Sequence, residues 1–250
     1  MNIGLKLWSS NHHLFSEAVE LFEKKEFDFI EMHAENGSFD TTKLEPLKGI
    51  PVNIHSPNEN HFNLMQKSEE NEHIFQELFQ FADYFNSEYI VIHPGIGNHK
   101  EILFNNLEKM KSANNKDRTI IIENVPKVCV WPADNLYGYT YEMMKEILEV
   151  SGAGFCLDFT HAIKSAKSQN IDAKEFINKL MTLNPKVFHV CDADSEEEKD
   201  QHMNLGKGNL DLAFIKSKIL ENGSKMVVFE TPKEDGLSND VKNMDYFRGL

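Results

Sequence analysis

Eight short apolar runs recur along the 250-residue chain, and turn or helix-capping residues bound each of them. Several runs are almost entirely apolar, such as YIVIH, TIIIE and MVVFE. Strands covered on both faces have this composition, and the strands of a parallel sheet are covered in that way. The expected strands span residues 3–8, 27–32, 51–55, 89–93, 119–123, 154–158, 186–191 and 225–230.

Segments with helical periodicity lie between these runs, so strand and helix alternate, as in an α/β fold. Residues 33–50 are polar and proline-interrupted, and we expect a short helix or none there. No linker of changed composition divides the chain, which favours one closed (β/α)8 TIM barrel domain over residues 1–250. An open doubly wound sheet is the alternative, but no GxGxxG motif follows the first strand. The expected helices span residues 14–25, 68–85, 103–111, 141–150, 173–181 and 212–220.

The net charge argues against a general affinity for nucleic acid or anionic lipid. It is −14, from 26 Lys+Arg and 40 Asp+Glu, although bound metal ions would add local positive charge. Cys129, Cys156 and Cys191 are too few for a disulfide framework and indicate a reducing compartment. We find no signal-peptide pattern and no apolar run of membrane-spanning length. The expectation is a cytoplasmic protein that does not enter membranes.

Residues of metal-ligand type occur in or at the ends of six successive expected strands. The C-terminal strand ends of a β/α barrel meet at one face, where active sites are built. One such histidine is usually a hydrogen-bonded core or rim residue, but six strands in a row are hard to explain by packing. Imidazole and carboxylate are natural ligands of zinc and similar ions. The candidate ligands are His55, His93, Glu123, Asp158, His161, His189, Asp200, His202 and Glu230.

Two expected loops and six further histidines complete the candidate features. The loop at residues 126–139 carries Trp131 and Tyr137, which either stack on a sugar or base or pin the loop to the barrel rim. The loop at 192–199 is strongly acidic, and we assign no role to its glutamates. We expect surface or cap positions for His12, His13, His33, His61, His73 and His99.

Seven short segments resemble, in order and spacing, the endonuclease IV family of abasic-site endonucleases within the xylose isomerase-like barrel superfamily. Each segment is short, but together they cover about residues 50–232. They are NIHSP at 53–57, IHPG at 92–95, IIEN at 121–124, CLDFTHA at 156–162, FHVCDAD at 188–194, DQHMNLGKG at 200–208 and FETP at 229–232.

The resemblance implies a site with up to three Zn²⁺ ions that cleaves the phosphodiester at abasic sites by a metal-bound hydroxide. Two zinc ions would activate water and polarise phosphorus, and the third would stabilise the leaving oxygen. The first ion would be held by His55, His93 and Glu123. The second would share Glu123 and add Asp158, His189 and Glu230, and the third would be held by His161, Asp200 and His202.

The isomerase and epimerase branch of the same superfamily supplies the alternative. It typically keeps one metal, with Mn²⁺ or Mg²⁺ as further candidates, on Glu123, Asp158, His189 and Glu230. Glu123 and Glu230 would then be catalytic, moving a proton next to the carbonyl of a small sugar or sugar phosphate. A barrel that binds metal without catalysis is a third class, disfavoured because the ligand set is complete. In each case we expect a monomer.

Three departures from the endonuclease IV pattern affect the DNA-gripping loops. The loop at 35–43, ENGSFDTTK, lacks arginine where the family carries an arginine-rich insert. His55 is followed by SPNENHF, without the family's tyrosine, and the acidic loop at 192–199 would face the phosphates of a duplex. The metal ligands therefore match the family better than the DNA-binding loops do.

Overall fold

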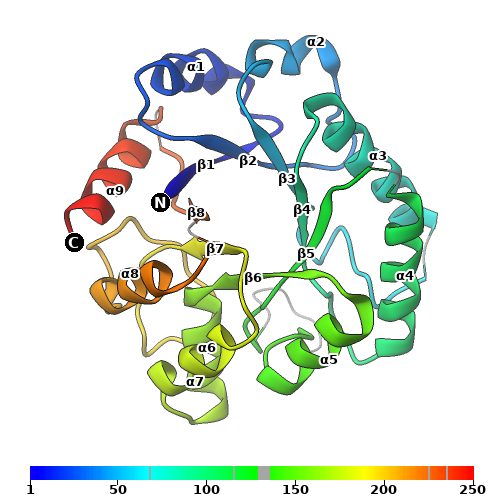
Figure 1. The fold of residues 1–250 in the computed structure, drawn as a ribbon, viewed down its shortest axis with the longest axis vertical. Coiled ribbons are helices and arrows are strands. Elements are labelled where there is room, and N and C mark those ends of the chain that lie inside the picture. The colour runs from blue at the N-terminus through cyan, green and yellow to red at the C-terminus, as the bar shows by residue number, and fades with distance from the viewer. Residues whose placement is uncertain (68, 115, 129–135, 225, 235) are drawn as a thin grey trace.

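Eight parallel strands close into a barrel in the order β1 to β8, and helices surround it as a ring (Figure 1). The computed structural model describes residues 1–67, 69–114, 116–128, 136–224, 226–234 and 236–250. Each strand pairs in parallel with its neighbours, and β8 closes the barrel on β1. The strands are β1 (Asn2–Trp8), β2 (Phe29–His33), β3 (Val52–His55), β4 (Tyr89–Ile92), β5 (Thr119–Glu123), β6 (Gly154–Asp158), β7 (Val187–Val190) and β8 (Met226–Phe229).

All six expected helices are present, and the connection after β2 is short, as the proline-interrupted sequence predicts. That connection contains one turn of α-helix followed by a 3₁₀ turn, Glu45–Leu47. Sequence analysis missed two helices, α6 and α9. The helices are α1 (Phe15–Glu23), α2 (Thr41–Leu44), α3 (Glu69–Phe85), α4 (Lys100–Ala113), α5 (Tyr141–Ser151), α6 (Phe159–Gln169), α7 (Ala173–Met181), α8 (Leu212–Glu221) and α9 (Ser238–Gly249).

Helix α6 lacks a solvent-facing polar stripe over most of its length, which is why its sequence did not indicate a helix. Its residues from Phe159 to Ala166 are all buried, including the polar Thr160, Lys164 and Ser165. The helix starts directly at the end of β6, where the Asp158 carboxylate accepts a hydrogen bond from the His161 N–H at 2.6 Å. This cap fixes the two candidate ligands relative to each other.

Alternation along the strands decides which side chains reach the barrel interior. An inner apolar cluster contains residues from six strands: Phe29, Tyr89, Val91, Ile121, Cys156, Val187 and Val228. Side chains two positions further along a strand face the same side. Glu123, Asp158 and Glu230 lie two residues beyond Ile121, Cys156 and Val228, and therefore project above this cluster.

A larger apolar cluster fills the space between the barrel and the helices. Cys156 and Cys191 are free thiols and both are buried. Cys129 lies outside the described residues. Within the part of the chain that the structure describes, no helix combines the length and the apolar character needed to span a membrane.

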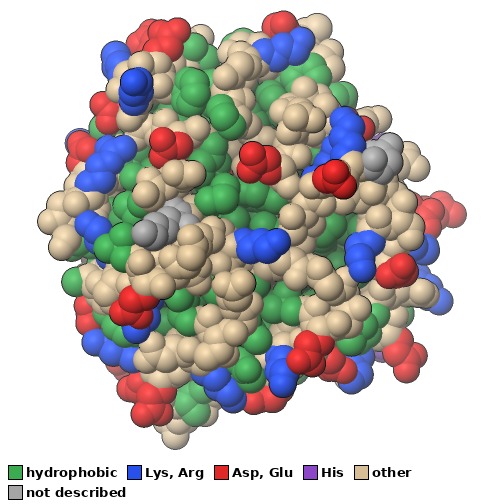
Figure 2. Space-filling model, in the orientation of Figure 1, with side chains coloured by type: hydrophobic (Ala, Val, Ile, Leu, Met, Phe, Trp, Pro, Cys, Tyr) green, Lys and Arg blue, Asp and Glu red, His purple; other side chains and the backbone are tan. Residues whose placement is uncertain are grey.

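The face of the molecule seen in the same orientation as the ribbon carries acidic and basic side chains interspersed over its rim (Figure 2). Green apolar side chains show between them, and neither sign of charge forms a continuous patch on this face. Nothing on this face therefore resembles the broad basic surface that binds nucleic acid through its phosphates.

Candidate metal centre

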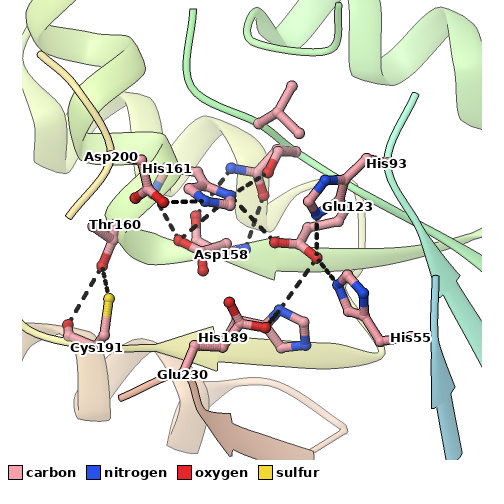
Figure 3. Close-up of polar contacts among 12 residues, drawn as sticks. His55, His93, Glu123, Asp158, Thr160, His161, His189, Cys191, Asp200 and Glu230 are labelled. Carbon is pink, nitrogen blue, oxygen red and sulfur yellow. Dashed lines mark hydrogen bonds and ion pairs between the residues drawn. The ribbon is translucent and has the colours of Figure 1, made fainter. Parts of the chain in front are cut away.

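The nine predicted ligands converge at the C-terminal ends of the strands. All of them except His202 are labelled in Figure 3. Among the described residues, five groups of side chains each place their ligand atoms within 4.8 Å of one another. Three of these groups coincide with the three sets that the resemblance implies. The other two overlap them and add Glu31 (with His55, His189 and Glu230) or Cys156 (with Glu123 and His189). The first ligand set is His55, His93 and Glu123; the second is Glu123, Asp158, His189 and Glu230; the third is His161, Asp200 and His202.

Glu123 lies at the centre of the first two sets and is fully buried. Its Oε2 is 3.0 Å from His55 Nε2 and 3.2 Å from His93 Nε2. The same oxygen is 3.2 Å from His189 Nδ1, which belongs to the second set. One carboxylate therefore faces ligands of both sets, as a bridging residue must.

The third set lies closer to solvent. Asp200 Oδ2 is 2.7 Å from His202 Nε2 and 3.6 Å from His161 Nε2. The His202 side chain is 34% exposed, whereas that of His161 is 6% exposed. The three residues lie on α6 and on the loop after β7, so their convergence depends on how that loop folds.

Asp192 holds that loop in place. Its buried carboxylate accepts hydrogen bonds from the backbone N–H groups of Gly206 and Gly208, each at 2.9 Å, and of Leu210 at 3.2 Å. A Cβ on Gly208 would lie 2.2 Å from the Ala193 carbonyl oxygen, so only glycine permits this approach. The loop is thereby pinned on both sides of the candidate ligands.

Four of the five histidines donate one ring N–H to an acceptor atom that is not itself a candidate metal ligand. His93 Nδ1 donates to the Glu59 carboxylate at 2.7 Å. Such outer partners fix the tautomer and leave the other ring nitrogen for a metal ion. The other three donate from Nδ1 to backbone carbonyls: His55 to Ser56 at 2.8 Å, His161 to Asn124 at 2.9 Å and His202 to Glu230 at 2.7 Å.

Lys6, Glu31 and Tyr89 form a buried polar layer that sequence analysis did not predict. Lys6 Nζ is 2.6 Å from Glu230 Oε1 and 2.9 Å from Glu31 Oε1. Glu31 also accepts a hydrogen bond from the Tyr89 hydroxyl at 3.0 Å and lies 2.9 Å from His189 Nε2. A charged residue inside an otherwise apolar strand could have indicated this layer. Glu31 lies two positions beyond Phe29, which faces the barrel interior, so Glu31 faces the interior as well.

Burial and mutual proximity perturb the pKa values throughout the centre. Burial, reinforced by the carboxylates of Glu123 and Glu230, raises the pKa of Asp158 to about 6. Burial opposes protonation of His93, but Glu59 and Glu123 outweigh it and raise its pKa to about 10. The pKa of His202 is raised to about 9, because the Asp200 carboxylate outweighs the burial penalty. The buried carboxylates thus favour positively charged groups beside them.

The polar atoms that lack partners mark where that charge would be placed. Among the described residues, buried side-chain atoms without a hydrogen-bond partner include His93 Nε2, Glu123 Oε1, Asp158 Oδ2, His189 Nδ1 and Asp200 Oδ1. Buried polar atoms are normally paired, so a cluster of unpaired ones needs an explanation. The donor set of imidazole nitrogens and carboxylate oxygens fits divalent ions such as zinc.

A cavity of about 470 Å³ opens above the centre. His55, His93, His161 and His202 line its floor together with Lys6 and Glu230. Its walls are largely apolar and include Trp8, Pro126, Val128, Leu136 and Pro232.

Two expectations for residues near the cavity need correction or refinement. The expected surface position of His33 is wrong, because β2 extends to this residue and buries it beside His55, with ring centroids 5.4 Å apart. Tyr137 packs in the large apolar cluster and its backbone N–H donates to the Gly95 carbonyl, so it pins the loop to the rim. Trp131 lies outside the described residues.

The loop after β2 folds back onto helix α3. Backbone N–H groups of Gly37 and Phe39 donate to the Glu77 carboxylate at 2.7 and 2.9 Å. The Phe39 ring packs edge-on against Phe81, with centroids 5.0 Å apart. This segment, which lacks arginine in the sequence, therefore lies against α3.

A profile described as xylose isomerase-like TIM barrel matches residues 17–248. The chain belongs to this family. The resemblance found from the sequence segments is therefore confirmed at the level of the family and the fold. Among its sequence relatives is the probable endonuclease 4 of Thermosipho melanesiensis, which is 27% identical over 224 residues, 81% of this chain. The match covers 75% of that protein's length. A second relative, an uncharacterized protein of Methanocaldococcus jannaschii, is 26% identical over 166 residues, which are 61% of this chain and 53% of that protein.

Solved proteins that are named for different activities share this fold. Endonuclease IV from Thermus thermophilus matches 100% of this chain and 98% of its own, with a TM-score of 0.72 and 19% identity. A xylose isomerase domain-containing protein from Salmonella typhimurium LT2 matches 98% of this chain and 96% of its own, with a TM-score of 0.70 and 12% identity. Both likenesses establish the barrel, and the choice of reaction rests on the site.

Proposed function

We propose that this protein is a zinc-dependent phosphodiesterase of the endonuclease IV type that cleaves DNA at abasic sites. The carrying observation is the third ligand set, His161, Asp200 and His202, which converges beside the other two. A one-metal isomerase needs only Glu123, Asp158, His189 and Glu230. The 27% identity to an endonuclease 4 over most of the chain supports the same choice.

Each of the candidate ligand sets would have a separate task in the reaction. Bound zinc ions would polarise a phosphoryl group and lower the pKa of a water molecule toward neutrality. Glu123 would hold the first two positions close together, because its Oε2 faces His93 of the first set and His189 of the second. His161, Asp200 and His202 line the cavity, where they would hold an ion whose charge stabilises the leaving oxygen of the phosphodiester.

Lys6 would keep Glu230 ionised and oriented. Its ammonium group lies 2.6 Å from the Glu230 carboxylate, and this contact counters the burial that favours the neutral acid, so the pKa of Glu230 is lowered. The apolar walls would exclude bulk water from the reacting group, which strengthens every charge interaction inside the cavity.

A small sugar or sugar phosphate is the second candidate substrate, with Glu123 and Glu230 as the proton-moving residues. The cavity of about 470 Å³ favours it, since pockets of this size suit small ligands. The loop after β2, folded against α3, also offers no arginine for gripping a duplex.

A substrate comparison tests the proposal. Protein purified without chelator is incubated with a duplex that carries a single abasic site and, separately, with ketoses, aldoses and their phosphates. Incision at the abasic site supports the nuclease. Sugar interconversion without incision would replace it with the isomerase.

A further inference from the structure

His93 differs from His55, His161 and His202 in what fixes its ring. His55, His161 and His202 donate Nδ1–H to backbone carbonyls, which no substitution of a side chain removes. His93 instead donates Nδ1–H to the carboxylate of Glu59 at 2.7 Å. Its orientation therefore depends on one side chain outside the predicted ligand sets.

The Glu59 carboxylate is buried beside the ring that it contacts. The side chains of Glu59 and His93 are 9% and 10% exposed, and both residues line the cavity. On the opposite side of the ring, His93 Nε2 lies 3.2 Å from Glu123 Oε2 and has no hydrogen-bond partner among the described residues. Nδ1 of the ring is thus held by the Glu59 carboxylate, and Nε2 is available to coordinate a metal ion.

The loop that carries Glu59 is tied to the loop that follows His93. The Asn63 side chain accepts a hydrogen bond from the Ile96 N–H at 3.0 Å and donates to the Ile96 carbonyl at 3.1 Å. Phe62 and Leu64 are buried on either side of Asn63. Glu59 and His93 therefore lie on two loops that are hydrogen-bonded to each other, so the fold itself brings the two side chains into contact.

We propose that Glu59 is a positioning residue that holds the His93 ring with Nε2 directed into the first ligand set. A carboxylate behind a metal-binding histidine fixes its tautomer and orientation and makes the ring a stronger ligand. The inference rests on the proposed metal centre, but it concerns zinc binding and not the reaction.

The test measures zinc affinity in a competition titration with a coloured chelator, on protein first stripped of metal. Glu59→Ala is expected to weaken one zinc per chain by about 10–100-fold, the usual effect of losing such an outer partner. The remaining zinc ions should keep the parent affinities, because their histidines do not contact Glu59. Circular dichroism checks that the variant is folded.

Two matched variants separate positioning from general disturbance. Glu59→Gln keeps an oxygen that accepts Nδ1–H, so it should restore most of the lost affinity even if Glu59→Ala folds poorly. Asn60→Ala changes an exposed neighbouring residue of the same loop that does not line the cavity, and it should bind zinc like the parent.

Several results would overturn the inference. These are parent-like zinc binding by Glu59→Ala, a loss in Glu59→Gln as large as in Glu59→Ala, an equal loss in Asn60→Ala, or a parent protein that binds no zinc. A parent protein that binds zinc but does not incise abasic DNA would refute the nuclease proposal and leave this inference intact.

Discussion

Replacing Glu123 by glutamine should disrupt two metal positions at once. Its carboxylate lies 3.0–3.2 Å from nitrogens of His55, His93 and His189, and the amide of glutamine carries no charge and is a poor bridge. Structural zinc sites with four ligands bind by about 10–16 kcal/mol, or roughly 3 kcal/mol per ligand. Since about 1.4 kcal/mol is a factor of ten, each of the two positions should lose about 100-fold in affinity.

Metal analysis of Glu123→Gln and of the parent, both purified without chelator, measures this effect. We expect the parent to carry more than one zinc per chain and the variant to carry at least one fewer, with nearly all activity lost. Glu149→Gln on the exposed side of α5 is the matched control, because its side chain is 67% exposed and lies outside the ligand sets. Full metal content and activity in Glu123→Gln would refute the bridging role.

Two further predictions rest on the geometry of the centre, and a third, for Trp131, rests on the sequence alone. The pKa values of His93 and His202, about 10 and about 9, mean that zinc must displace protons at neutral pH, so affinity should rise as the pH is raised toward those values. Calorimetry in buffers of different ionisation enthalpy should show net proton release, and its absence would contradict this reasoning. Asp192→Ala should leave several loop amides without a hydrogen-bond acceptor, at a cost of about 1–3 kcal/mol each. We therefore expect a lower Tm and the loss of zinc from the third ligand set. A variant with the Tm and zinc content of the parent would contradict this role of Asp192. Trp131→Ala should raise KM without changing Tm if the ring stacks on substrate, and a lowered Tm would show that it pins the loop.

The barrel strands were predictable because both of their faces are buried, which makes their sequences apolar over their full length. The candidate ligands at the strand ends could be identified for the related reason that a carboxylate or histidine at the end of an apolar run is conspicuous. Helix α9 escaped notice because few of its residues are apolar, and α6 because it follows β6 without a loop and buries the polar residues Thr160, Lys164 and Ser165.

The outer partners of the ligands were harder to predict. Glu59 lies in a loop, and its approach to His93 depends on the Asn63 contacts between two loops, which no periodicity encodes. Lys6 and Glu31 could have been found by counting two positions along β1 and β2 from residues that face the barrel interior. Sequence patterns thus identify residues by their element and face, whereas loop-mediated contacts require the folded chain.

The most direct test of the three-set metal centre removes the third set alone. Asp200→Asn combined with His202→Ala leaves His161 as the single protein ligand, which cannot offset the cost of dehydrating a zinc ion. Incision of an abasic duplex is measured for this variant and the parent, with zinc content and circular dichroism recorded on the same samples. The account predicts a folded variant that has lost one zinc and several orders of magnitude in incision rate, because the charge on the leaving oxygen is no longer stabilised. A parent protein that never incises the duplex, together with sugar interconversion that survives the double substitution, would contradict it.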